Sequence, residues 1–410
     1  MPSLNEDLYR HILLLLGQNS PNSSRRNQET LDTLLSCCLV SKLWLGLAQP
    51  ILQTAIPIET HNHLQKRILQ RSKHQLRLVR EVVVREHGRG QIERHFDAAE
   101  IFHALPTEHL KALHFFDQIN LDHFFGGAGG DAAEWKLIGT KLYSPPALPF
   151  DFSNLRQATL CSTPGGSFWT PLLMVAPALV DLTFHGAGWW GYSSYADSPS
   201  YLPSQPPPFS LRRLDIMRSH IKPVPLEWLL SSSAESLRDL RMLYLQREWD
   251  SMIDVSALRQ QGLLPSVEYL NVQTSETVSK ELGRQMSDPL AQWSGIKSIY
   301  FCAADNKYRA AIIHGISRLR PIPVVELGVT DMKIHDFKGL FKLRKGKLQP
   351  GTTLRLITRP SRWRSRGRGG GYSRWDQYAP EYWAEYAEEA TELAARQGVE
   401  LEITDTPLFA

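Results

Sequence analysis

Hydrophobic residues recur along most of the chain in a six-residue pattern: one apolar residue, two others, an apolar residue, one other and a third apolar residue. Successive copies begin about 30 residues apart, a period typical of stacked strand-and-helix units. The nine copies are Val79/Val82/Val84, Leu110/Leu113/Phe115, Leu155/Ala158/Leu160, Leu179/Leu182/Phe184, Leu211/Leu214/Ile216, Leu237/Leu240/Met242, Val267/Leu270/Val272, Ile296/Ile299/Phe301 and Val324/Leu327/Val329. Shorter versions follow, around Leu354 and Leu356 and around Val399, Leu401 and Ile403.

The alternation inside each copy predicts a short β-strand with one apolar face. Helix-like segments lie between copies, at residues 168–176, 226–232, 277–286, 308–319 and 381–396. Regular alternation of strands with helices favours a parallel sheet backed by helices, and stacking makes the apolar faces into one continuous core. The sequence therefore predicts an α/β fold, an irregular solenoid over residues 79–410. A doubly wound α/β domain is the alternative.

The first fifty residues follow a helical pattern instead. Leu4, Leu8, Ile12 and Leu15 share one helix face, and Ser3 with Glu6 fits a capping box at its start. A second apolar arc combines Leu35, Leu39, Leu43 and Leu47 with Val40 and Trp44, and it is too wide for a surface helix. A unit this small needs a partner or a larger domain to cover such an arc. It is interpreted as a docking module, with a helical cap of the following domain as the alternative.

LNEDLYRHIL, residues 4–13, resembles the opening of an F-box, usually written L-P-x-E-L-x-x-x-I-L. LLSCCLVSKLWLGLAQPIL, residues 34–52, is similar to the closing L-V-C-x-x-W half of that family. Asn5, Asp7 and Ser41 depart from the usual Pro, Glu and Cys, and residues 17–29 form an inserted polar loop. The resemblance implies a three-helix F-box module at residues 1–56 that binds the Skp-type adaptor of a cullin-RING ubiquitin ligase. The matching contact positions are Leu4, Leu8, Ile12, Leu39, Val40 and Trp44.

The recurring pattern resembles an irregular leucine-rich repeat, a common companion of an F-box in one chain. The Asn or Cys that this family places three residues after the last apolar position is missing from all nine copies. Residues 57–78 are expected to form a linker or the first helix of the array. Together the two resemblances imply the substrate-recognition subunit of an SCF-type ligase, whose repeats bind an unknown target protein.

Composition fits that expectation. The formal charge is only +4, from 46 Lys and Arg against 42 Asp and Glu, so no nucleic-acid or membrane partner is indicated. Cys37, Cys38, Cys161 and Cys302 show neither metal spacing nor a disulfide framework, which favours a reducing compartment. Without a signal peptide, and with an apolar run at residues 13–16 too short for a membrane span, the chain is expected in the cytoplasm or nucleus.

If the strands are in register, the position between the last two apolar residues of each copy lies on the opposite face of the sheet. These positions are Val83, His114, Thr159, Thr183, Asp215, Arg241, Asn271, Tyr300 and Gly328. Asp215, Arg241 and Tyr300 are predicted to contact the target, together with Trp189, Trp190 and Tyr192 of an aromatic segment at residues 186–208. The alternatives are an ordinary polar sheet face and a rigid Pro-rich loop folded onto the repeats.

An Arg/Gly-rich segment offers a different function. Arg362, Arg364, Arg366 and Arg368 precede three glycines and lie among aromatic residues, as in segments that stack on single-stranded RNA. An interaction scaffold that binds RNA is therefore the alternative to a ligase subunit. The sequence contains no convincing nucleophile elbow, P-loop, metal-spaced cluster or carboxylate pair. No enzymatic activity, cofactor or metal is expected.

Overall fold

The computed structural model describes residues 55–59, 76–85, 105–115, 150–161, 169–185, 205–217, 223–245, 258, 261–274, 295–303, 322–328, 334, 337–338, 348, 350–358 and 379–404. The chain divides into two compact units. Unit 1 contains Met1–Thr163 and Phe168–Leu179, and unit 2 contains Pro164–Ser167 and Val180–Ala410. The predicted F-box module, with all its adaptor-contact positions, lies outside the described residues.

Unit 1 contains four parallel strands, each paired with its neighbour along the chain. They are β1 (Ala55–Glu59), β2 (Glu81–Arg85), β3 (Ala112–Phe115) and β4 (Gln157–Cys161), accompanied by a 3-10 turn η1 (Thr107–His109) and by α9 (Trp169–Met174). Leu110, Leu113 and Ala158 are buried, as the apolar pattern requires.

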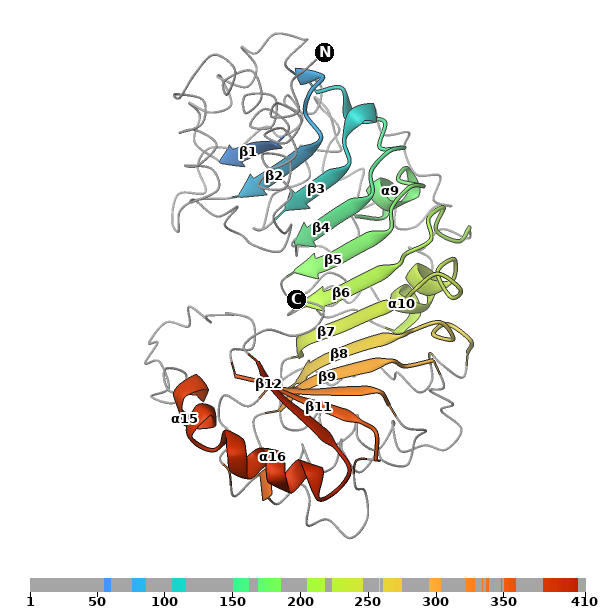
Figure 1. The fold of residues 1–410 in the computed structure, drawn as a ribbon. Helices are drawn as coiled ribbons and strands as arrows, with labels where there is room; N and C mark the ends of the chain where they lie inside the picture. The colour runs from blue at the N-terminus through green and yellow to red at the C-terminus, as the bar shows by residue number, and fades with distance from the viewer. Residues whose placement is uncertain are drawn as a thin grey trace, which may run out of the picture. The chain divides into compact units, whose positions relative to one another are not determined.

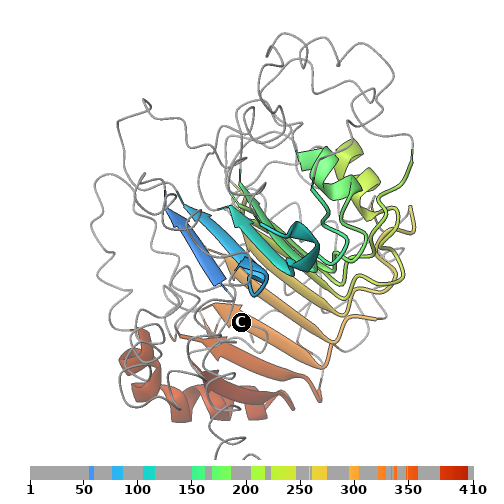
Figure 2. The same ribbon diagram turned by 90° about the horizontal axis from the view of Figure 1, so that it is seen from above.

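Unit 2 continues the same arrangement over eight parallel strands. They are β5 (Asp181–His185), β6 (Arg213–Met217), β7 (Asp239–Leu245), β8 (Tyr269–Thr274), β9 (Ser298–Ala303), β10 (Val324–Gly328), β11 (Thr353–Ile357) and β12 (Glu400–Thr404). Each strand pairs with the next one along the chain, and they run side by side in that order in Figure 1 and Figure 2. A doubly wound sheet reverses its strand order at a switch point, so the strand order within each unit excludes that alternative.

The core of unit 2 is a row of apolar side chains in register. It consists of Leu182, Leu214, Leu240, Leu270, Ile299, Val325 and Leu354, none more than 2% exposed. The helix α10 (Pro223–Leu230) buries Leu226, Leu229 and Leu230, which occupy one helix face. Strands with a shared apolar row and sequential parallel pairing define an α/β solenoid-like array, as the periodicity predicted.

Helices occur at three of the predicted segments, in α9, in α10 and near the carboxyl end. The last segment is divided into α15 (Ala379–Glu385) and α16 (Ala387–Ala395), because Tyr386 leaves the helical conformation at φ −101° and ψ 9°. Trp383 is fully buried there, with its ring edge-on to Phe337 at 5.7 Å between centroids. The segments 277–286 and 308–319 lie outside the described residues.

The structure corrects two boundaries. At β10 the buried apolar residues are Ile322, just before the strand, and Val325 and Leu327 within it, so the predicted copy beginning at Val324 was two residues too late. The parallel pairing also starts earlier than residue 79, because β1 pairs with β2 from Ala55 opposite Glu81. Among the helices that the structure describes, none has the length and apolarity needed to cross a bilayer.

Candidate binding surfaces

One row of mostly polar side chains crosses unit 2 on the face opposite its apolar core. Strand register places in this row Thr183, Asp215, Arg241, Asn271, Tyr300, Glu326, Arg355 and Glu402. Three predicted target-binding residues, Asp215, Arg241 and Tyr300, therefore lie on one line. Glu326 takes the place predicted for Gly328, which follows from the corrected register of β10.

Four charged residues on β6 and β7 form a network on this face. Arg213 donates two hydrogen bonds to Asp215, with Nε–Oδ1 3.0 Å and Nη2–Oδ2 2.8 Å. Arg241 binds Asp239 in the same two-pronged way, with Nε–Oδ1 3.0 Å and Nη2–Oδ2 2.8 Å. The two pairs are joined by contacts of 3.7 Å, Arg241 Nε to Asp215 Oδ1 and Arg213 Nε to Asp239 Oδ2. Bidentate guanidinium–carboxylate pairs fix geometry as well as charge.

Burial controls the electrostatics of this network. The side chains of Asp215 and Arg241 are only 3% and 8% exposed. Desolvation raises the pKa of Asp239, against the opposing hydrogen bonds and charge of Arg241. Desolvation also opposes the charge on Arg213, but its hydrogen bonds and ion pair with Asp215 leave the pKa of Arg213 raised. The network therefore holds two cations and two anions in a largely dry position.

The adjoining strands β8 and β9 contribute a polar patch with little exposure. Tyr269 and Ser298 are register partners, as are Asn271 and Tyr300, and all four are at most 5% exposed. The Arg241 guanidinium lies 5.3 Å from the centre of the Tyr269 ring, and burial raises the pKa of the Tyr269 hydroxyl. In the part of the chain that the structure describes, Asn271 Oδ1 and Ser298 Oγ are buried without a hydrogen-bond partner.

A second charged cluster lies on the last three strands. Arg355 donates through Nη1 to Glu326 Oε1 at 2.6 Å and through Nε to Glu402 Oε2 at 2.6 Å. Glu326 is fully buried, whereas the Glu402 side chain is 49% exposed. One guanidinium thus joins a dry carboxylate to a solvated one.

Unit 1 has its own version of the polar row. Val83, His114 and Thr159 are in register across β2, β3 and β4. His114 Nδ1 lies 2.8 Å from the Thr159 hydroxyl, and His114 Nε2 lies 4.0 Å from Glu81 Oε1. Both His114 and Thr159 are buried, so the middle positions of the β3 and β4 copies are polar and enclosed as well.

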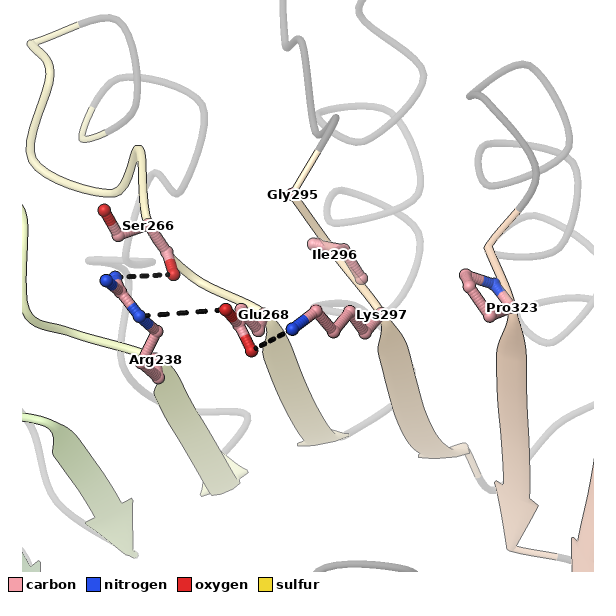
Figure 3. A pocket seen from close by; sticks show the side chains of 7 residues that line it. All are labelled: Arg238, Ser266, Glu268, Gly295, Ile296, Lys297 and Pro323. Carbon is pink, nitrogen blue, oxygen red and sulfur yellow. Dashed lines mark hydrogen bonds and ion pairs between the residues drawn. The ribbon is translucent and has the colours of Figure 1, made fainter.

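Sequence reasoning missed a shallow pocket of about 450 Å³ at the amino ends of β7 to β10. Figure 3 shows Arg238, Glu268 and Lys297 side by side there, each immediately before its strand. Lys297 Nζ lies 2.8 Å from Glu268 Oε2, and Arg238 Nε lies 3.7 Å from Glu268 Oε1. The hydrogen bond from Lys297 lowers the pKa of Glu268. Ser266, Gly295, Ile296 and Pro323 complete the lining.

This sheet face combines several kinds of polar group. Its rows present guanidinium, carboxylate, amide and hydroxyl groups at repeating positions, which suits a mixed hydrogen-bonding interface. Within the described ranges, no group of three or more His, Cys, Asp or Glu side chains is arranged to hold a metal ion. The aromatic candidates Trp189, Trp190 and Tyr192 and the arginines 362, 364, 366 and 368 lie outside the described residues.

The described residues thus define a parallel α/β solenoid-like array with a charged polar row on one face. Comparison with known proteins adds no family to this description: no protein-family model matches the sequence, and no curated protein is significantly similar to it.

Proposed function

We propose that this chain is the substrate-recognition subunit of an SCF-type cullin-RING ubiquitin ligase. In this proposal residues 4–52 bind a Skp-type adaptor, and the array binds the target protein. The observation that supports the target-binding role is the sequential parallel pairing of β5 to β12, which aligns one position of every repeat along a single face. Such a face is long enough for a protein segment to contact several repeats at once.

The proposed mechanism is scaffolding without chemistry on this chain. The adaptor fixes the amino-terminal helices to the ligase, while the array holds the target near a ubiquitin-charged enzyme. Tethering raises the effective concentration of target lysines at that enzyme.

Burial limits which charged residues of this sheet face contact a target. Asp215 and Tyr300 are nearly inaccessible, so they support the surface and do not form its outer layer. Arg213, Asp239 and Glu402 retain more exposure, 24%, 17% and 49% of their side chains. Glu402 lies in the row, and Arg213 and Asp239 lie two residues before it on the same sheet face, so these three are the more accessible recognition groups of that face.

Adaptor capture tests the ligase assignment. The full chain is purified together with a Skp-type adaptor, and Leu8→Asp and Trp44→Ala are compared with the unaltered protein. Both substitutions are expected to abolish or strongly reduce capture, because Leu8 and Trp44 match apolar contact positions of the family. Lys297→Ala, at a well-exposed side chain of the array, is the control and is expected to leave capture unchanged.

Two outcomes contradict the proposal. If the unaltered chain captures no adaptor, the ligase assignment fails and a general interaction scaffold takes its place. If Leu8→Asp and Trp44→Ala both capture the adaptor normally, the amino-terminal helices act as a cap of the array and not as a docking module.

A further inference from the structure

The residue immediately before each of β2, β3 and β4 is a cation. The three residues are Arg80, Lys111 and Arg156. Their backbones are neighbours, because the Lys111 N–H donates to the Arg80 carbonyl at 2.7 Å and the Arg156 N–H donates to the Lys111 carbonyl at 2.8 Å. Adjacent strands lie about 4.8 Å apart, so these three cations leave the sheet along a line of roughly 10 Å.

The described residues provide this line with no carboxylate counterion. Lys111 and Arg156 are exposed. The Arg80 guanidinium donates to backbone carbonyls, to that of Arg77 at 2.6 Å and that of Val79 at 2.9 Å. Over the residues that the structure describes, no carboxylate lies within ion-pair distance of these three cations or of the exposed Arg77. We call Arg77, Arg80, Lys111 and Arg156 the basic edge.

Two acidic residues precede the same strands, but each has another contact. Glu108, in η1, lies 3.8 Å from His109 Nε2. Asp151, in the turn before β4, accepts a hydrogen bond from the Ser153 N–H at 2.8 Å, which lowers the pKa of Asp151. Among the residues that the structure describes, neither carboxylate compensates the cations of the basic edge, which face solvent or another molecule.

Unit 2 shows that the fold does not need cations at this position. There the equivalent residues are Arg212, Arg238, Glu268 and Lys297, joined by the same backbone hydrogen bonds. Glu268 compensates its two neighbours inside the row. Further along, Pro323 precedes β10 and Thr352 precedes β11. A carboxylate or a neutral residue is thus compatible with this site in the repeat.

We propose that the basic edge of unit 1 binds an extended, Asp- and Glu-rich segment of another protein. Like charges directly opposite each other on neighbouring strands are unfavourable, and a row of carboxylates relieves that repulsion. An extended peptide advances about 3.3 Å per residue, so a line of roughly 10 Å accommodates about three residues. Several single negative charges along a peptide match separate cations better than one multiply charged group does.

A protein segment fits this edge better than a nucleic acid. Single-stranded nucleic acid is held by a long basic groove together with aromatic stacking platforms. The aromatic residues described next to the edge, Phe150 and Phe152, are buried and provide no platform. The inference deepens the proposed function by giving the chemistry of one target segment, and it rests on that function for the partner being a ligase target.

Peptide binding by the full-length chain tests the inference. A fluorescently labelled glutamate-rich peptide is titrated with the protein and followed by anisotropy at low and high salt. The complex is expected to weaken as salt rises. Lys111→Gln and Arg156→Gln are each expected to weaken it about two- to fivefold, the range for one exposed charge pair, and the double variant is expected to weaken it further.

Lys297→Gln is the matched control, since it removes a cation from the same position of unit 2, where Glu268 already compensates it. It is expected to leave peptide affinity unchanged. The inference is overturned if the glutamate-rich peptide does not bind, if Lys297→Gln weakens binding as much as Lys111→Gln, or if a phosphoserine peptide or single-stranded RNA binds more tightly. Adaptor capture by the Lys111→Gln/Arg156→Gln variant, measured in parallel, is expected to be normal, so loss of peptide binding and failure of the ligase proposal are separate results.

Discussion

The strands of unit 2 carry the same ionic chemistry in two different surroundings. On the sheet face, Arg213, Asp215, Asp239 and Arg241 form a nearly dry network with two bidentate pairs. At the amino ends of the strands, Arg238, Glu268 and Lys297 form a ladder in which every side chain is at least 39% exposed. Both connect adjacent strands through oppositely charged groups, although the bidentate pairs of the network lie within single strands, and the ladder is surrounded by far more water.

The pKa shifts of Asp239 in the network and Glu268 in the ladder run in opposite directions. Burial raises the pKa of Asp239 in the network, although two guanidinium groups lie near it. The pKa of Glu268 in the ladder is lowered, because its charge remains solvated while Lys297 donates to it. Removing one partner from a buried pair leaves an uncompensated charge, whereas an exposed pair can be replaced by water. The network should therefore respond to mutation far more strongly than the ladder.

The largest effect is expected at Asp215. Asp215→Asn removes a charge that lies against both Arg213 and Arg241 while keeping the side chain's shape. Breaking a buried pair in this way costs about 3–5 kcal/mol of unfolding free energy, to be measured by urea denaturation. A loss below about 1 kcal/mol is the value typical of an exposed ion pair. It would show that the buried network contributes no more to stability than the exposed ladder does.

Arg355 allows the same comparison within a single side chain. Double-mutant cycles pair Arg355→Met with Glu326→Gln and, separately, with Glu402→Gln. The coupling to fully buried Glu326 is expected to be about 0.5–3 kcal/mol, and the coupling to half-exposed Glu402 less than about 1 kcal/mol. Equal couplings would show that burial does not set the strength of these pairs.

The repeat period made the strands and their register predictable, but it did not predict that the polar side chains between the apolar positions are buried. Polar residues between apolar ones predicted the row containing Asp215 and Arg241, since alternation in a strand is a local property. Their burial was not predictable, because polar side chains are usually exposed and only packing from distant parts of a chain can enclose them. The line of cations immediately before β2, β3 and β4 could have been predicted from the sequence. The register that pairs Leu113 with Ala158 also makes Lys111 and Arg156 neighbours.

The two boundary errors have simple physical origins. Pro57 lies inside β1 and reads as a strand breaker, yet a proline is tolerated in a strand at the start of a sheet, where one side of the backbone needs no partner. Around β10, Ile322/Val325/Leu327 and Val324/Leu327/Val329 both fit the apolar pattern, so the sequence allows two placements that differ by two residues. Only the burial of Ile322 and Val325, against half-exposed Val324, decides between them.

The smallest effect is expected in the exposed ladder, and it depends on pH. Glu268→Gln should cost less than about 1 kcal/mol at neutral pH, and less still in high salt, because solvent screens both contacts of Glu268. A carboxyl whose pKa is lowered on folding adds stability above its unfolded value, 4.5 for Glu268, and that contribution disappears as pH falls through the lower folded value. Unfolding measured at a series of pH values should therefore show the variant and the unaltered protein converging in acid. A difference that instead grew on acidification would mean that Lys297 does not stabilise the charged form of Glu268.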